Sequence, residues 1–363
     1  MRPRVAVVLS GYGVVQRGAE TMLDQLLPRL EPHFDFEVYS MSGRGPGGRA
    51  KGAIPRTEIE PIYLAARSSR KVLDTLYLDP LHVEWTTHLL HSLPDLYRRR
   101  YDVIWHETGL WGGKILAGLR RHTGVRLLDV AHSSYPGWEL PFARCRPDAY
   151  VTADRHLAGL VRQEFPHLRV EIVPQAVDTE LFQPDGETLE LDLPRPIALI
   201  PGALAPEKSP EIALRAVART GASALVAGSG PLAWDIDTMA TDMLAPDRYL
   251  RVEVERTEMP TIYRAADVVV LASPLESGAL AVLEAMACGV PVVTTDDTVR
   301  REILGDAGEL VGSREIADFS AAIGRTLARD WGSQPRQRAL EFSVDRASES
   351  FRAILMSLAE TQP

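Results

Sequence analysis

The chain of 363 residues has two cysteines, four lysines and no long apolar run. A transmembrane helix needs about 20 consecutive apolar residues. The apolar stretch near the N-terminus, at positions 5–9, is also too short for the core of a secretory signal peptide. Cys145 and Cys288 lie far apart and in no metal-ligand spacing, which favours reduced thiols. The sequence therefore predicts a cytoplasmic protein without membrane spans.

Positive charge is also in deficit, because the net charge is -9. Nucleic-acid binding needs clustered positive charge, so we expect no nucleic-acid partner. Arginine outnumbers lysine 36 to 4, so a retained lysine suggests a position that needs a compact ammonium group. Some basic residues form clusters that could touch anionic lipid, but the net charge favours at most peripheral membrane contact. These are Arg67, Arg70, Lys71, Arg98, Arg99 and Arg100.

Short apolar runs recur along the chain and are typical of fully buried parallel strands. The first series lies at 5–10, 36–41, 102–107, 127–132, 149–154 and 170–175. The second lies at 197–202, 224–230, 250–255, 267–273 and 290–295. Helical patterns separate the runs. One has Leu23, Leu26, Leu27 and Leu30 on one face, and the last has Phe351, Ile354, Leu355 and Leu358. Strands that alternate with helices predict doubly wound parallel sheets of the α/β class.

A polar stretch with several prolines, residues 177–196, separates the two series and is predicted to be a hinge or linker. We expect an N-terminal Rossmann-like domain at 1–182 and a second one at 183–340. A C-terminal helix at 341–363 would pack back on the first domain. Two such domains predict a cleft between the carboxyl ends of two sheets, where ligands bind. The Gly- and Arg-rich segment 42–53 is predicted to be a mobile loop.

Glycine-containing turns between strands and helices favour anion binding, because helix N-termini present free N–H groups. One such turn follows the run at 267–273, where Ser277, Gly278 and Ala279 are predicted to open a helix to about residue 287. Glu276 and Glu284 would then lie on one helix face about 12 Å apart. This separation suits two ends of an extended ligand and excludes a proton-sharing carboxylate pair. Spacing alone leaves open that Glu276 is a helix cap and Glu284 a solvated residue.

The segment from Glu276 to Glu284, followed by AMACGVPVV, resembles the signature of family 4 retaining glycosyltransferases, which have the GT-B fold. That signature has two glutamates separated by seven residues. The resemblance extends over most of the chain. It includes RGAETML, AHSSYPG, VPQAVDTELFQP, IPGALAPEKSPEIALRAVA, LVAGSGPL and YRAADVVVLAS.

The resemblance implies that the domain at 1–182 binds the acceptor and that the domain at 183–340 binds the nucleotide sugar. It also implies a role for each matching residue. Glu276 would hold hydroxyls of the donor sugar, and Glu284 would hold the ribose hydroxyls. The turn of Ser277, Gly278, Ala279 and Leu280 would bind the diphosphate through backbone N–H groups. In addition, Lys208 would contact the diphosphate, Gly18 would allow close backbone approach to the phosphate or acceptor, and His132 would lie beside the reacting sugar. Otherwise Lys208 would be a surface charge and His132 a hydrogen-bonded core residue.

The sequence departs from the family at several positions. Ala203 stands where relatives usually have an arginine that pairs with the lysine, and Arg17 stands where they usually have glycine. Phe and Gly are usual at positions 278 and 279, and Asn-Gly at 175 and 176. These changes bear on the identity of the donor sugar more than on the reaction type.

Two further motifs carry less weight. The Gly11-Tyr12-Gly13 turn lacks the third glycine of a dinucleotide fingerprint. A group of His82, Glu84, His88 and His91 lies on a predicted helix but has no third convincing metal ligand, so we expect a packing or solvated role.

We therefore predict retaining transfer from a nucleotide-diphosphate sugar, with UDP or GDP sugars favoured, and no cofactor or metal. The acceptor would be a hydroxyl of a small or lipid-linked molecule, such as a natural-product or cell-envelope intermediate. Two alternatives stay open. One is another enzyme on the same architecture, such as a nucleotide-sugar epimerase or a glucan synthase, and the other is a degenerate partner subunit.

The missing arginine at position 203 generates a prediction about Arg17. If Arg17 supplies the lost charge to the departing diphosphate, Arg17→Ala should lower turnover on the order of 100-fold, as for one lost charge-stabilising donor. Steady-state kinetics with the preferred donor would measure this. Unchanged turnover in the variant would refute the compensation.

Overall fold

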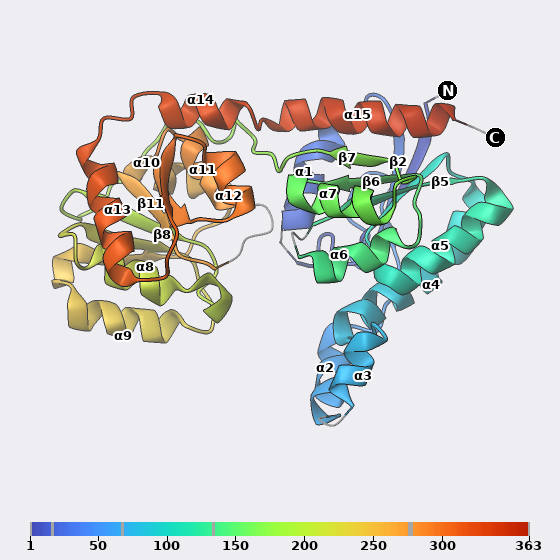
Figure 1. Cartoon of the computed structure of the whole chain (residues 1–363), viewed down its shortest axis with the longest axis horizontal. Helices are drawn as coiled ribbons and strands as arrows, with labels where there is room; N and C mark the ends of the chain where they lie inside the picture. The colour runs from blue at the N-terminus through green and yellow to red at the C-terminus, as the bar shows by residue number, and fades with distance from the viewer. Residues whose placement is uncertain (1, 16–17, 67–68, 133–134, 275–278, 362–363) are drawn as a thin grey trace. The chain divides into compact units, whose positions relative to one another are not determined.

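A computed structural model describes residues 2–15, 18–66, 69–132, 135–274 and 279–361 (Figure 1). The chain divides into two compact units. The first comprises Met1–Pro174 with Ala347–Pro363, and the second comprises Gln175–Arg346. Several residues that the sequence singles out lie outside the described residues. They are Arg17, Arg67, Glu276, Ser277 and Gly278.

The first unit is a seven-stranded, all-parallel sheet in the order β3-β2-β1-β4-β5-β6-β7. Its strands are β1 (Arg4–Val8), β2 (Asp35–Ser40), β3 (Arg49–Ala50), β4 (Val103–His106), β5 (Arg126–Ala131), β6 (Ala149–Thr152) and β7 (Val170–Ile172). Its helices are α1 (Gly18–Leu30), α2 (Arg56–Ala65), α3 (Arg70–Thr75), α4 (Pro80–Arg99), α5 (Gly109–Thr123), α6 (Pro136–Ala143) and α7 (Arg155–Glu164). The last helix, α15 (Val344–Glu360), belongs to this unit from Ala347 onwards.

The second unit is a six-stranded parallel sheet in the order β10-β9-β8-β11-β12-β13. Its strands are β8 (Ile197–Pro201), β9 (Ser223–Ala227), β10 (Tyr249–Val252), β11 (Val268–Leu271), β12 (Val292–Thr295) and β13 (Gly308–Val311). Its helices are α8 (Pro210–Val217), α9 (Ala233–Met243), α10 (Met259–Ala265), α11 (Leu280–Ala287), α12 (Thr298–Leu304), α13 (Ile316–Ala328) and α14 (Gln334–Leu340). Short 3₁₀ turns, η1 (Pro206–Lys208) and η2 (Pro246–Arg248), complete it.

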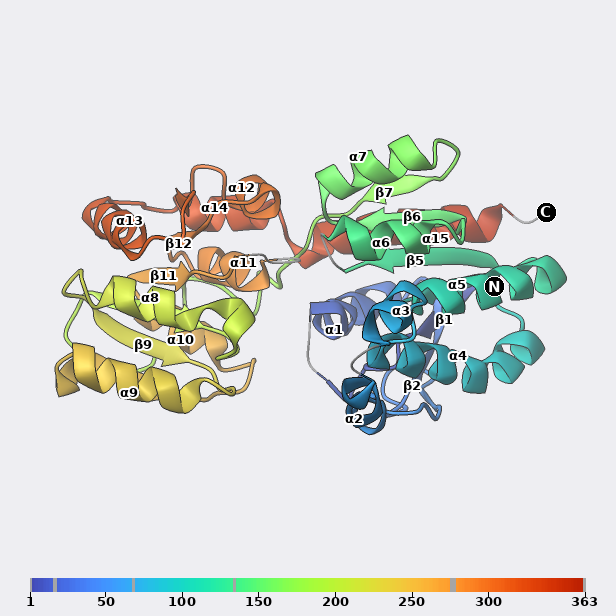
Figure 2. The same cartoon turned by 60° about the horizontal axis from the view of Figure 1, so that its bottom comes forward.

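Helices cover both faces of this second sheet (Figure 2). Ile197 and Leu199 of β8 pack with α10, α11 and α12, whereas Ala198 and Ile200 of the same strand pack with α8, α9 and α13. Because both faces are buried, the strand is apolar at every position. The predicted α/β class with two Rossmann-like parallel sheets is confirmed.

All eleven predicted strands correspond to strands of the structure, but two observed strands were not predicted. One is β13, whose Gly-Glu-Leu-Val sequence mixes polar and apolar residues. The other is β3, inside the segment predicted to be a mobile loop. That prediction was wrong for the end of the segment, because β3 pairs with β2 and Lys51 forms an ion pair with Asp95.

The predicted linker also packs more closely than expected. The units divide between Pro174 and Gln175, so residues 177–196 belong to the second unit. Val177 and Phe182 are fully buried there. Arg336 of α14 donates hydrogen bonds to the carbonyls of Thr179, Phe182 and Ala287 at 2.7–2.9 Å. The segment is thus attached to the C-terminal end of α11 and is not a free hinge.

Within the first unit, α15 packs on the sheet through the apolar face that the sequence indicates. Phe351 stacks on Trp105 of β4, with ring centroids 4.8 Å apart and planes inclined by 7°. Both rings are buried, and Arg169 donates a hydrogen bond to Ser357 at 2.9 Å. The C-terminal helix therefore completes the core of the N-terminal unit.

Removing this ring should destabilise the first unit. We expect Phe351→Ala to lower the free energy of unfolding by about 3–5 kcal/mol, since it leaves a cavity against Trp105. Arg352→Ala, on the exposed side of the same helix, is the matched control and should change it by less than about 0.5 kcal/mol. Urea denaturation followed by tryptophan fluorescence measures both, and equal effects would contradict the docking role of Phe351.

Candidate functional site

The turn before α11 lies at the carboxyl edge of the second sheet. Leu280 is the first helical residue, and Ala279 before it has a left-handed backbone with φ +46° and ψ +40°. The helix that carries Glu284 therefore begins later than the predicted start at Ser277. Glu276 lies outside the described residues, so its predicted separation of 12 Å from Glu284 stays a prediction.

The backbone at Ala279 gives a physical reason for the family's usual glycine at this position. A left-handed conformation costs a residue with a Cβ about 1 kcal/mol, whereas glycine adopts it freely. Here an alanine occupies it, and its methyl group is buried.

Glu284 is buried on α11 and both of its carboxylate oxygens are bonded. Arg256 Nη2 donates to Oε1 at 2.5 Å, and the Tyr263 hydroxyl donates to Oε2 at 3.0 Å. Only 7% of Glu284 is exposed, which excludes the solvated role that spacing alone left open. Arg256 and Tyr263 were not identified from the sequence, because nothing in their spacing links them to Glu284.

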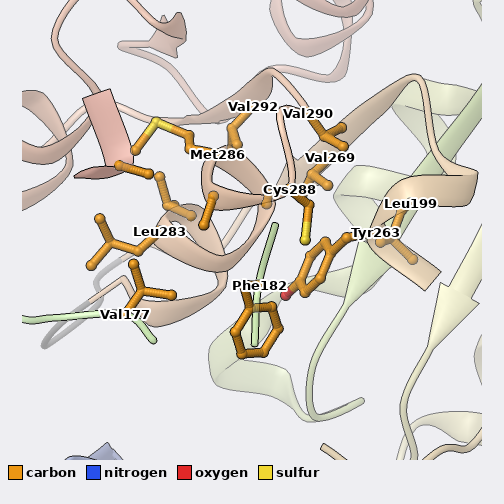
Figure 3. Close-up of a cluster of buried hydrophobic side chains, with 14 of the residues drawn as sticks. Val177, Phe182, Leu199, Tyr263, Val269, Leu283, Met286, Cys288, Val290 and Val292 are labelled. Atoms are coloured by element: carbon orange, nitrogen blue, oxygen red, sulfur yellow. The ribbon is translucent and has the colours of Figure 1, made fainter. Parts of the chain in front are cut away.

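The two residues that donate to Glu284 pack against an aromatic ring. Tyr263 lies in the core cluster shown in Figure 3, where its ring meets that of Phe182 with centroids 6.0 Å apart. The guanidinium of Arg256 lies 5.3 Å from the centroid of the same Phe182 ring. Burial raises the pKa of Glu284, although Arg256 and Tyr263 act in the opposite direction. Burial and the adjacent carboxylate raise the pKa of Tyr263 far above its usual value.

This arrangement leaves acceptor capacity on Glu284. An ionised carboxylate has about four lone-pair sites, and the described residues use one on each oxygen. Each oxygen can accept one more hydrogen bond, and two adjacent hydroxyls of a ligand would satisfy both.

Lys208 ends the short turn η1, which follows β8. Its side chain is half-buried, and the next residue, Ser209, has a left-handed backbone with φ +49°. The hydroxyl of Ser209 accepts a hydrogen bond from Arg314 at 2.6 Å. Ala203, in the loop before η1, is exposed.

The loop after β9 needs glycine where it approaches the loop between β8 and η1. A Cβ on Gly228 would lie 1.9 Å from the Gly202 carbonyl oxygen, and one on Gly230 would lie 2.5 Å from that of Leu204. The GSG sequence is therefore a packing requirement, and it brings two loops together at the carboxyl edge.

In the first unit, Gly18 is the first residue of α1 and is exposed. A Cβ there would meet no protein atom within 4 Å, so the position has open space in front of it. Glu20, in the first turn of the same helix, is buried.

His132 directly follows β5, and Glu107 directly follows the neighbouring strand β4. His132 Nε2 forms an ion pair with Glu107 Oε1. Burial opposes the charge on His132, but three carboxylates outweigh it and raise the pKa of the ring above its usual value. The three are Glu107, Glu139 and Glu20. Glu107 was not predicted, although it follows β4 directly, as His132 follows β5.

Other ionisable groups lie behind this pair. Burial and the nearby carboxylates of Glu139 and Glu107 raise the pKa of Asp129. The Tyr150 hydroxyl donates to Glu139 at 3.4 Å. His106 is fully buried, and burial lowers its pKa to about 3, so its ring is neutral. The carboxyl ends of β4 and β5 thus combine His132, whose pKa is raised, with several acids.

The other histidine group has a structural role. Of its members, His82, Glu84 and His88 are buried on α4, with Glu84 paired to Arg56 and His82 to Asp79. No group of three or more metal-ligating side chains occurs among the described residues. Over the same part of the chain, no helix is both long and apolar enough to cross a membrane.

The predicted site residues thus fall on both units. Ala279, Leu280, Glu284 and Lys208 belong to the second unit, and Gly18 and His132 belong to the first.

The sequence of the second unit is similar to that of a known protein family. Residues 185–340 match the family model described as glycosyl transferases group 1. D-inositol 3-phosphate glycosyltransferase of Mycobacterium tuberculosis is 28% identical, over 50% of this chain and 41% of its own length. The chain thus spans about two fifths of the length of the curated relatives it matches.

Solved structures resemble the whole chain. Sucrose-phosphate synthase from Thermosynechococcus elongatus superposes with a TM-score of 0.77 at 18% identity, covering 98% of this chain and 99% of that one. HepE of Anabaena in complex with UDP-glucose gives 0.68 at 14% identity, covering 98% and 100%. The chain therefore has the fold of the GT-B glycosyltransferases, and part of its second unit is similar to the group 1 glycosyl transferases.

Proposed function

We propose that this chain is a family 4 retaining glycosyltransferase that moves a sugar from a UDP-sugar to a hydroxyl acceptor. The observation that carries the proposal is the buried Glu284, held by Arg256 and Tyr263, with each oxygen accepting one hydrogen bond from the described residues. The 2′ and 3′ hydroxyls of a ribose are adjacent donors of the kind that such a carboxylate binds. HepE, whose solved complexes contain UDP and UDP-glucose, supports UDP as the nucleotide.

The negative charge that develops on the departing diphosphate would be stabilised by the turn before α11 and by Lys208. The backbone N–H groups of Ala279 and Leu280 lie at a helix start, where partial positive charge favours phosphate. Glu276 and Ser277 to Gly278 complete the proposed donor site through the family resemblance. Lys208 lies half-buried at the end of η1. We propose that its ammonium group contacts the diphosphate.

His132 is proposed to lie beside the reacting sugar. Its pairing with Glu107 holds the ring in one orientation and favours the protonated form, which donates a hydrogen bond. In the proposed reaction the acceptor hydroxyl attacks the face from which the diphosphate leaves, and a phosphate oxygen takes its proton. The protein contributes positioning and charge stabilisation, and the nucleotide sugar is the only co-substrate.

The test uses the purified chain with UDP-glucose and other UDP-sugars in an NMR assay of transfer to water or to an added acceptor. A first product with the anomeric configuration of the donor supports retention. A first product of inverted configuration would exclude the retaining mechanism, and interconversion of the donor without transfer would indicate an epimerase. A chain that binds UDP but neither hydrolyses nor transfers any donor would be a degenerate subunit.

Removing the charge of Glu284 should weaken nucleotide binding. A hydrogen bond to a charged group contributes about 1.5–3 kcal/mol, so Glu284→Gln should lower the affinity for UDP about 10- to 100-fold. Tyr263→Phe leaves the charge in place and should have a smaller effect in the same direction. Isothermal titration calorimetry measures both. Glu315→Gln, at an exposed helix start without a side-chain cap, is the control. Unchanged UDP affinity in Glu284→Gln would refute this role.

The His132–Glu107 pair generates a pH prediction. Because the pKa of His132 is raised on folding, the protonated ring stabilises the fold below its usual pKa of about 6.5. That stability is lost as the pH rises through the higher folded value. Glu107→Gln should lower the pKa of His132, and the loss should then begin at lower pH. Histidine NMR titrations, assigned with His132→Asn, measure this. The prediction fails if the titration of His132 does not move.

A further inference from the structure

Arg300 is a fully buried arginine with no role in the features described so far. It lies in the first turns of α12 and has no exposed surface. Removing a guanidinium from water carries a large desolvation penalty, so a buried arginine persists only with well-placed partners. Its partners lie at the carboxyl ends of β11 and β12, the edge at which open α/β sheets bind their ligands.

The guanidinium bonds twice to a single residue. Nη1 donates to the carbonyl oxygen of Ser273 at 2.9 Å, and Nη2 donates to the hydroxyl of the same residue at 3.1 Å. Ser273 is itself buried. Two bonds from one planar fork fix both the position and the orientation of the residue that accepts them.

Further contacts join the guanidinium of Arg300 to the end of the neighbouring strand β12. Nη1 lies 3.1 Å from a carboxylate oxygen of Asp297 and 3.4 Å from the carbonyl oxygen of Thr295, the last residue of β12. Asp297 also accepts a hydrogen bond from the backbone N–H of Arg300 at 2.7 Å. Arg300 therefore joins the ends of two adjacent strands through one buried charge.

Ser273 precedes Glu276 by three residues and Ala279 by six. We propose that Arg300 is a positioning residue that fixes the root of the donor-binding turn. It holds the chain where it leaves β11 towards Glu276 and α11. This inference deepens the proposed function and rests on it.

A role in stability alone is a different hypothesis with different consequences. A buried ion pair is often replaceable by apolar residues without loss of stability. If Arg300 only stabilised the fold, a folded variant would keep the exchange behaviour of the turn and its turnover. If it positions the turn, both should change while UDP, held at Glu284, still binds.

The test compares Arg300→Met, Arg300→Lys and Ser273→Ala with wild type. Arg301→Met is the matched control, because Arg301 is the next residue, is 61% exposed and pairs with Asp296. Hydrogen exchange of peptides that cover residues 272–280 measures anchoring without any need for activity. We expect exchange there about tenfold faster in Arg300→Met, and no change in the control.

Kinetics with the UDP-sugar give the second measurement. Arg300→Met should lower kcat on the order of 100-fold, since small misplacements of substrate-binding groups have effects of that size. Its affinity for UDP should fall by a much smaller factor than kcat, because Glu284 still holds the ribose while only the diphosphate contacts at the turn weaken. Arg300→Lys keeps the charge but not the fork and should recover only part of kcat. If Arg300→Met does not fold, Arg300→Lys and Ser273→Ala decide by the same measurements.

Wild-type exchange in these folded variants, with kcat within about threefold of wild type, would overturn the inference. Faster exchange in variants of a chain that transfers no sugar would uphold the anchoring of the turn and reject the proposed function. The two failures are thus distinguishable.

Discussion

A carboxylate buried in an apolar core must be matched by donors, and Glu284 meets this constraint in the second unit. Its neighbours along α11 from Val282 to Ala287 are all buried, so the helix has no solvated side to which the charge could turn. An isolated charge there would carry a desolvation penalty of several kcal/mol. Arg256 and Tyr263 offset that penalty, and they come from the loop after β10 and from α10.

Two arginines bind the chain before and after α11. Arg336 fixes its last carbonyl at Ala287 together with the chain that enters the second unit. On the other side, Arg300 fixes Ser273 before the turn that leads into the helix. Arginines suit this task because each carries several directional donors on a rigid plane. A chain with 36 arginines and few lysines has many such groups available.

The sequence predicted the strands well because buried parallel strands are apolar on both faces, and this pattern needs no knowledge of tertiary contacts. It predicted Glu284 and His132 because a recognisable motif and a strand end mark them. It did not predict Arg256, Tyr263, Glu107 or Arg300. These residues act through partners from 3 to 28 positions away, and their chemistry appears only after folding has brought those partners together. It also extended the helix of Glu284 too far, because a left-handed residue such as Ala279 has no composition signal when it is not glycine.

The departures from the family's usual residues differ in the size of their expected energetic effects. An alanine at position 279 costs about 1 kcal/mol in backbone strain, but its buried methyl group returns about 0.8 kcal/mol, so the exchange is nearly neutral. An alanine at position 203 removes a full positive charge, and no comparable local gain accompanies it because the residue is exposed. One lost charge-stabilising donor changes an enzymatic rate about 100-fold or more. The loss at 203, and not the change at 279, is therefore the departure that must be compensated if the diphosphate is to leave at a useful rate.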